Sequence, residues 1–268
     1  QAGALILGHV NALGTGRLDI HEGTLSASLP LTERQGVTND IALSHTNGSG
    51  TVFIGGTNDL RLSGVISGTS GITKTGSDTL FLSGDNTFSG ATSISNGVLA
   101  LDATGAIAAS ETVHIAAGAR LDVSSWTNGY TFAGTQSLSG SGSVTGSVIV
   151  ASGGHLSAGT SSEVGRLTFL NDLTLGENTV IDWNADSAAL TADVILVRGT
   201  LRLPQNATIR ISGSSTLPRL RVLFKAPTIM GAHHVRNWTV LNGPQSMQAA
   251  LNGDEIVLRY TGMVFSVR

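Results

Sequence analysis

The fold of this 268-residue chain is decided by residues 71–99, which read GITKTGSDTLFLSGDNTFSGATSISNGVL. Apolar and polar residues alternate over four to six positions, as in residues 79–82, and each run ends at Gly, Asn, Asp or Ser. Alternation with a period of two, bounded by turn residues, is typical of short β-strands with one buried face. The stretch therefore predicts strands joined by tight turns. The side chains expected to point into the core are those of Leu80, Leu82, Ile94, Leu99 and Leu101.

The same pattern recurs along the rest of the chain. A Gly-x-Leu unit occurs at residues 23–25, 97–99, 154–156 and 199–201, and a looser copy at residues 117–121. Leu99 and Leu121 stand 22 residues apart, a plausible length for one coil of a solenoid, whereas Leu121 and Leu156 stand 35 apart. Imperfect repeats of roughly 20 residues with strands in each unit indicate a β-solenoid. We expect the longer step to be a protruding loop or an irregular coil that contains Trp126, Tyr130 and Phe132.

The composition agrees with this fold and excludes several classes of protein. There are 35 Gly residues and only 4% aromatic residues, which suits narrow coils with tight corners better than a bulky globular core. The chain has no Cys, so it holds no disulfide framework and no thiolate metal site. A net charge of −3 argues against a nucleic-acid partner. No apolar run approaches the ~18 residues of a membrane helix, so we expect no transmembrane segment.

Residues 71–99 resemble the autotransporter-associated β-strand repeat, also called the passenger-associated transport repeat. That repeat reads roughly G-x-x-K-x-G-x-G-x-L-x-L-S-G-x-N-T-Y-x-G-x-T-x-I-x-x-G-x-L. Two positions depart from it, because Asp78 stands where Gly is usual and Phe88 where Tyr is common. Weaker similarity in the flanks extends the resemblance over residues 1 to about 200. It implies a right-handed parallel β-helix that is exported across a Gram-negative outer membrane and displayed at the cell surface.

Two polar residues of the repeat carry expectations of their own. Lys74 lies among glycines, which suits the corner of a coil with the ammonium group in solvent. Asn86 follows a Ser-Gly-Asp turn sequence, and its side chain can bond the backbone of that turn.

The composition changes near residue 198. Four of the five prolines lie beyond it, and residues 198–253 carry seven basic and no acidic residues, a balance of +7. Residues 1–197 carry six basic and sixteen acidic residues, a balance of −10. We interpret residues 1–197 as the solenoid body, with the repeat at residues 71–101. Residues 198–268 are then a β-rich C-terminal cap or assembly segment, because an open solenoid end leaves a strand edge and an apolar core uncovered.

No catalytic, cofactor-binding or metal-binding residues are assigned, and we expect the protein not to be an enzyme. The seven His residues are scattered, and the adjacent His233 and His234 would point to opposite faces of a strand. Carboxylates near strand ends could pair between coils, but no basic clamp accompanies them. They are Asp19, Asp102, Asp122, Asp172 and Asp182. Trp126, Trp183 and Trp238 could stack on sugars, and we interpret them as packing anchors.

Two functional classes remain. The first is a structural subunit of a bacterial cell-surface or extracellular fibre, in which solenoid subunits assemble head to tail. The alternative is a monomeric or anchored autotransporter-type adhesin that binds host or neighbouring-cell glycans or matrix. The expected partners are another copy of the chain and, through the basic segment, a surface glycan or lipopolysaccharide. The predicted assembly residues are apolar residues near both termini and basic residues between them: Ala4, Leu5, Ile6, Leu7, Arg219, Arg221, Lys225, Met263, Val264, Phe265 and Val267.

Overall fold

The computed structural model describes residues 3–32, 36–44, 51–186, 191–213, 220–243 and 247–260. Within these ranges the chain consists of β-strands and turns with one short 3-10 helix, η1 (Ala232–Asn237). None of its described helical segments is long and apolar enough to cross a membrane. The chain divides into two compact units: Gln1–Tyr130 with Gly142–Ser147, and Thr131–Ser141 with Val148–Arg268. In both units the strands pair mostly in parallel and form stacked sheets, so the predicted β-solenoid is confirmed.

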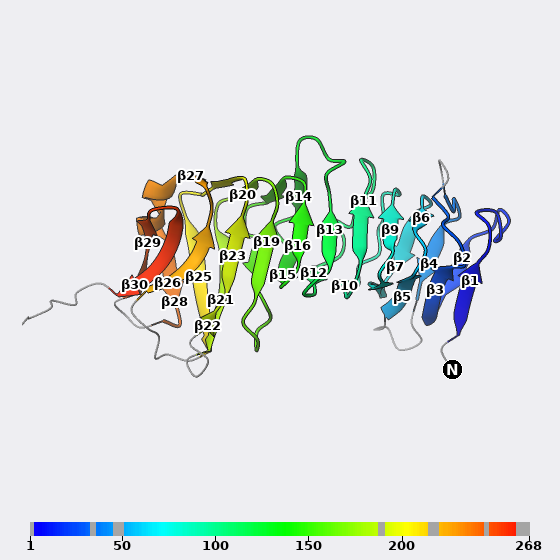
Figure 1. Ribbon diagram of the computed structural model, residues 1–268, viewed down its shortest axis with the longest axis horizontal. Helices are drawn as coiled ribbons and strands as arrows, with labels where there is room; N and C mark the ends of the chain where they lie inside the picture. Colours follow the sequence, from blue (N-terminus) through cyan, green and yellow to red (C-terminus); the bar gives the residue numbers. More distant parts are fainter. Residues whose placement is uncertain are drawn as a thin grey trace, which may run out of the picture. The chain divides into compact units, whose positions relative to one another are not determined.

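In the N-terminal unit, strands from successive coils lie side by side in parallel sheets (Figure 1). The first sheet contains β1 (Ala4–Leu7), β3 (Gly23–Ala27), β5 (Thr51–Gly56), β8 (Gly71–Gly76), β10 (Thr92–Ile94) and β12 (Thr112–Ile115). The second contains β6 (Leu60–Leu62), β9 (Thr79–Leu82), β11 (Val98–Leu101), β13 (Arg120–Asp122) and β16 (Ser143–Thr145). The third contains β2 (Leu18–Ile20), β4 (Ile41–Leu43) and β7 (Ile66–Gly68).

The C-terminal unit repeats this arrangement. Its first sheet contains β15 (Ser137–Gly140), β18 (His155–Ser157), β21 (Thr179–Asp186), β25 (Ala207–Gly213) and β28 (Thr239–Leu241), with β22 (Thr191–Ala192) antiparallel to β21. The second contains β19 (Arg166–Phe169), β23 (Val194–Val197), β26 (Leu220–Lys225), β30 (Glu255–Tyr260) and β29 (Met247–Asn252). The third contains β17 (Val148–Val150), β20 (Leu173–Leu175), β24 (Thr200–Arg202) and β27 (Thr228–Met230). The chain passes from one unit to the other within β14 (Tyr130–Phe132).

Aliphatic side chains of successive coils stack on one another in the core. Leu80, Leu99, Leu121 and Val144 occupy one register position of the second sheet and are all buried. The five side chains predicted to point inward are buried, so that prediction is confirmed. Leu99 and Leu121 are direct register partners, which also confirms the 22-residue coil. Burying a Leu side chain stabilises a fold by about 1.5–3 kcal/mol, so this column is a main source of cohesion.

The longer step after Leu121 contains β14, β15, β16 and β17 together with a run of turns at residues 124–129, which includes Trp126. Leu121 pairs with Val144, and Leu156 pairs with Leu138, so the two leucines belong to different sheets. Tyr130 and Phe132 are buried in β14, so the prediction of a protruding loop or irregular coil is wrong for them. Residues 130–132 follow the alternation of a strand, with both aromatic rings directed inward, because each ring buries a large apolar surface.

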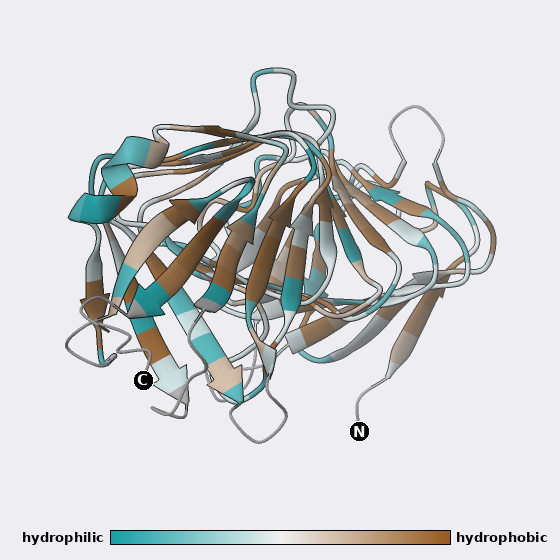
Figure 2. Ribbon diagram, turned by 60° about the vertical axis from the view of Figure 1, so that its left-hand side comes forward, coloured by the Kyte–Doolittle hydropathy of each residue, from teal (hydrophilic) through white to brown (hydrophobic). Residues whose placement is uncertain are grey.

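Strands of the C-terminal unit pair in parallel as far as β26, β27 and β28, and the last two strands, β29 and β30, pair antiparallel. Parallel pairing continues past residue 198 in the pairs β24–β27 and β25–β28, whereas β26–β30 and β29–β30 pair antiparallel. Most of the helix η1 is coloured teal in Figure 2, because its residues are mainly hydrophilic. His233 and His234 lie in this helix with ring centroids 3.9 Å apart. The expectation that they occupy opposite faces of a strand is therefore wrong. The domain boundary at residue 198 stays a prediction.

Candidate functional site

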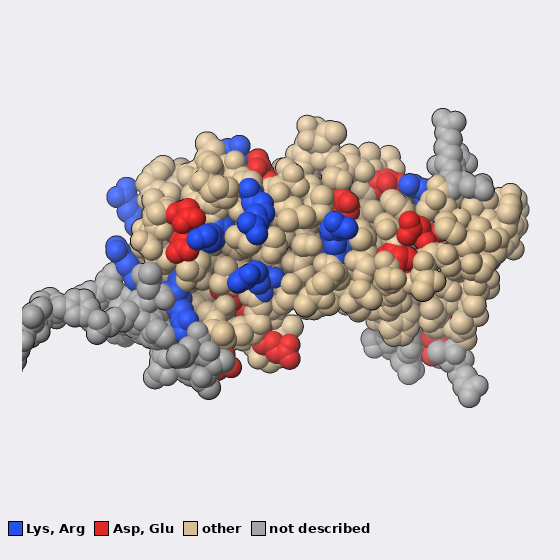
Figure 3. All heavy atoms as spheres, in the orientation of Figure 1, with Lys and Arg blue, Asp and Glu red and all other residues tan. Residues whose placement is uncertain are grey.

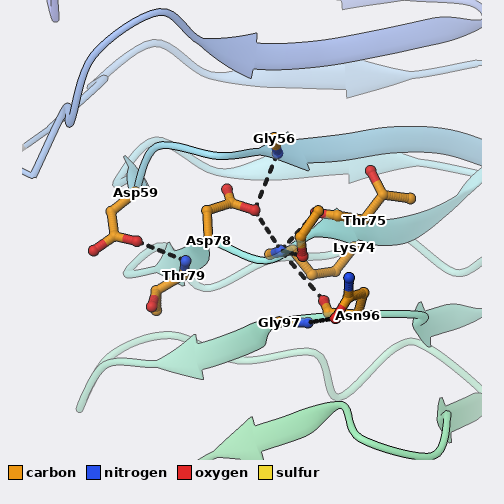
Figure 4. A network of polar contacts seen from close by, with 9 residues as sticks. Gly56, Asp59, Lys74, Thr75, Asp78, Thr79, Asn96 and Gly97 are labelled. Atoms are coloured by element: carbon orange, nitrogen blue, oxygen red, sulfur yellow. Dashed lines mark hydrogen bonds and ion pairs between the residues drawn. The ribbon is translucent and has the colours of Figure 1, made fainter.

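The repeat contains a buried lysine in place of a core aliphatic residue. Lys74 is completely buried in β8, in register with Ile54 and Ile94 of the neighbouring coils. Its ammonium nitrogen donates to the carbonyl oxygens of Thr75 at 2.6 Å and Gly76 at 3.1 Å (Figure 4). The prediction that this ammonium group lies in solvent is therefore wrong. The glycine-rich corner instead places backbone carbonyl oxygens around the charge.

Asp78 supplies the counter-charge to Lys74. Its Oδ1 lies 2.7 Å from the Lys74 nitrogen, and both side chains are 0% exposed. The same oxygen accepts a hydrogen bond from the Gly56 amide at 3.0 Å, one coil earlier. Lys74 also donates to the Asn96 carbonyl at 3.4 Å, one coil later. The ion pair thus ties three consecutive coils together, and the departure from the usual Gly at position 78 provides its negative charge.

Asn86 also links successive coils. Its Oδ1 accepts a hydrogen bond from the Ile66 amide at 2.9 Å, and its Nδ2 donates to the Ala106 carbonyl at 3.0 Å. The side chain is buried, and both partners lie 20 residues away. The expectation that Asn86 bonds its own turn is wrong, because the neighbouring coils present better-placed backbone groups.

A hollow of about 410 Å³, lined by several residues with polar side chains, lies on the outward face of the first sheet of the C-terminal unit. Along β15, β18, β21 and β25, inward residues pack in the core and the residues between them face outward. The outward residues that line the hollow are mostly hydroxyl-bearing. They include Ser137, Ser139, Ser157, Thr160, Asp182 and Arg210.

A row of polar and charged side chains from successive coils lies along this hollow. Ser157, Asp182 and Arg210 occupy one register position on β18, β21 and β25. Asp182 pairs with the Nε of Arg210, and its other oxygen lies 3.4 Å from His155 Nδ1. The hydrogen bond that Arg210 donates to the Asp182 carboxylate raises the pKa of Arg210. Asp182, one of the carboxylates singled out in the sequence, is thus brought together with His155. The sequence interpretation missed Arg210, although it stands one coil, 28 residues, beyond Asp182.

The loop at residues 159–165 forms a wall of the hollow. Gly159 has a φ of 79°, and a Cβ there would lie 2.3 Å from the Glu163 carbonyl oxygen, so only Gly fits this turn. Thr160 Oγ1 accepts hydrogen bonds from the amides of Ser162 at 3.3 Å and Glu163 at 3.1 Å. These bonds brace the loop beside the serines of β15 and β18.

A buried carboxyl group anchors the base of that loop. Asp193 accepts hydrogen bonds from the Gly165 and Asn184 amides, each at 2.8 Å, and its carbonyl accepts one from the Trp183 indole at 2.8 Å. Burial raises the pKa of Asp193 to about 7, against the effect of the two amide donors. The wall of the hollow is therefore joined to β21 through a group that titrates near neutral pH. Nothing in the local sequence around Asp193 points to this role.

The predicted assembly residues divide between the two units. Ala4, Leu5 and Ile6 are exposed in β1, with Ile6 60% accessible, whereas Leu7 is buried. Arg221 is half-buried in β26, and Lys225 forms surface ion pairs with Asp254 and Glu255. The remaining predicted assembly residues lie outside the described part of the chain: Arg219, Met263, Val264, Phe265 and Val267.

Intramolecular pairs partly neutralise the basic segment. Arg210 pairs with Asp182 of the preceding coil, and Lys225 pairs with two acidic side chains that lie just beyond residue 253. The face in Figure 3 is mostly uncharged, with scattered basic and acidic groups, several of them adjacent. Two of the seven basic residues of residues 198–253 thus have acidic partners within the chain.

The other carboxylates singled out in the sequence have local partners. Asp19 pairs with Arg17, and Asp102 pairs with Arg61, whose guanidinium lies over the ring of Phe81. Two more accept backbone hydrogen bonds: Asp122 from Ser124 and Asp172 from Thr200. Trp183 and Trp238 are buried, as expected of packing anchors, and Trp126 meets the ring of Tyr130 edge-on.

Parts of the chain are similar to known autotransporter sequences. Residues 72–101 match the family model described as passenger-associated-transport-repeat. The β-solenoid therefore carries a passenger-associated transport repeat, and the resemblance predicted from residues 71–99 is confirmed. Over 260 residues, 94% of the chain, it is 28% identical to a protein named adhesin BmaC autotransporter from Brucella suis biovar 1 (strain 1330). The chain spans 7% of that relative's length.

Proposed function

We propose that this chain is a surface-displayed segment of an autotransporter-type adhesin, and that it binds a ligand rather than catalysing a reaction. The observation that carries the proposal is the similarity over 94% of the chain to an autotransporter adhesin, together with the transport repeat at residues 72–101. The β-solenoid suits this role, because its outward sheet faces are broad and rigid surfaces for side chains. Display outside a Gram-negative outer membrane is part of the same proposal.

The head-to-tail fibre has less support. The relative is named an adhesin, and two of the basic residues that would draw subunits together already have acidic partners within the chain. Exposed Leu5 and Ile6 on β1 remain compatible with strand addition, so self-association is an outcome that the test must detect.

Binding and sedimentation of the purified chain separate the two functions. We expect a monomer that binds saturably to immobilised extracellular-matrix proteins or cell-surface glycans, measured by biolayer interferometry. The same chain displayed on a non-adherent Gram-negative host should increase attachment to epithelial cells, relative to a host that displays an unrelated solenoid. Ordered polymers in analytical ultracentrifugation, with no binding to any surface, would contradict the adhesin proposal and favour the fibre.

A further inference from the structure

We propose that the hollow over β15, β18, β21 and β25 binds a neutral oligosaccharide through the Asp182–Arg210 pair and the surrounding hydroxyl groups. This inference rests on the proposed binding function and names the class of ligand for it.

The groups that line the hollow match the hydrogen-bonding needs of sugar hydroxyls. Each sugar hydroxyl both donates and accepts, and the hollow offers a carboxylate acceptor in Asp182, guanidinium donors in Arg210 and serine hydroxyls that do both. Arg210 uses its Nε for Asp182, and within the described residues its two terminal amino groups have no hydrogen-bond partner. Those donors are available to a ligand.

The spacing of the groups suits an extended ligand. Ser157, Asp182 and Arg210 come from three consecutive coils at one register position. Neighbouring strands lie about 4.8 Å apart, comparable with the length of one sugar residue. A chain of sugars that lies across the strands therefore meets a new polar side chain at each coil.

The charge of the hollow favours a neutral ligand. Asp182 and Arg210 are its charged lining residues within the described chain, and their charges cancel. An acidic sugar would gain from Arg210 but would be repelled by Asp182, which lies beside it. An apolar ligand would displace water from the pair and the serines without replacing their hydrogen bonds, which is unfavourable.

The hollow is also preorganised. Its floor is a parallel sheet with the buried column Leu138, Leu156, Ile181 and Ile209 beneath it. Its wall, residues 159–165, is held by Gly159 and by the buried Asp193. Side chains on rigid strands lose little further freedom when they bind, so affinity is not spent on ordering the site. The fold does not need an exposed ion pair here, because such pairs add only about 0–1 kcal/mol of stability.

A panel of immobilised neutral and acidic oligosaccharides tests the inference, with the full chain as the soluble partner. We expect binding to neutral members, with a loss of at least tenfold in affinity for Arg210→Gln and for Asp182→Asn. Arg202→Gln, an exposed Arg on β24 in a different sheet of the same unit, is the matched control and should bind like the parent. Melting temperatures show whether each variant remains folded.

The outcomes are distinct. Binding confined to acidic oligosaccharides, or neutral binding that Arg210→Gln and Asp182→Asn leave unchanged, overturns the assignment of ligand and site. If the chain binds matrix proteins but no oligosaccharide, the inference fails while the adhesin proposal stands. If it binds neither, both fail.

Discussion

Two ion pairs of the same chemical type stand in opposite surroundings in the two units. In the N-terminal unit, the side chains of Lys74 and Asp78 are both 0% exposed, and Lys74 lies in the core column between Ile54 and Ile94. In the C-terminal unit, Arg210 is 47% and Asp182 28% exposed, and the pair borders the hollow. The first pair is surrounded by backbone carbonyls and amides, whereas the second is open to a ligand.

The difference shows what each pair can do. A buried charge is costly to desolvate and is tolerated only with a counter-charge and further hydrogen bonds, so its partners are tightly specified. Lys74 and Asp78 have these partners in three successive coils, which suits a role in fixing the register between coils. An exposed pair contributes little to stability, so Arg210 and Asp182 are free to serve binding.

Breaking the buried pair should have the largest effect. Lys74→Met leaves the Asp78 carboxylate buried without a counter-charge, which should destabilise the fold by about 3–5 kcal/mol. Asp78→Gly should cost less, because the ammonium group keeps the carbonyl oxygens of Thr75, Gly76 and Asn96. Chemical denaturation of both single variants and of the double variant measures the coupling. The double variant should recover much of the stability lost in Lys74→Met, since no unpaired charge remains. A Lys74→Met protein that unfolds at the parent's denaturant concentration would contradict the structural role.

An intermediate effect is expected from Asp193, a buried carboxyl group that lacks a basic partner among the described residues. Its pKa in the folded chain is about 7, above the ordinary value of 3.8. The stability that this group contributes is therefore fully present below pH 3.8 and is lost as the pH rises through about 7. The slope is at most about 1.4 kcal/mol per pH unit. Denaturation midpoints between pH 4 and pH 8 measure it, and Asp193→Asn should flatten the profile. A stability that instead rises over this range in the parent but not in Asp193→Asn would show that the folded group is ionised throughout.

The smallest change in stability should come from the exposed pair. Arg210→Gln should alter the free energy of unfolding by less than about 1 kcal/mol, because water already solvates much of the guanidinium. Denaturation in parallel with Lys74→Met compares the removal of one positive charge in the two environments. Equal losses for the two variants would remove the distinction between a structural and an available ion pair.

The strands and the coil length could be predicted from the sequence, because both depend on local patterns. Alternation at residues 79–82 specifies a strand with one buried face, and the spacing of Gly-x-Leu units specifies the length of a coil. Leu80, Leu82 and Leu99 are accordingly buried as predicted. Alternation also occurs at residues 130–132, but it spans only three residues. The 35-residue gap between Leu121 and Leu156 favoured a loop there, so the strand that contains Tyr130 and Phe132 was not predicted.

The period of the structure follows from the amino-acid sequence alone: short strands, tight turns and a coil of about 22 residues with aliphatic side chains inside. The environment of the polar residues depends instead on contacts made in the folded chain. Lys74 lies in register between Ile54 and Ile94 of the neighbouring coils, although three of its four hydrogen-bond partners are local. The contacts that bridge Asn86 and join His155 and Arg210 to Asp182 come from neighbouring coils, 20 to 28 residues away in the chain. The physical reason is that the solvation of a charge depends on every group packed around it. In a solenoid those groups belong largely to the coils before and after, so no local pattern shows whether a lysine lies in water or in the core.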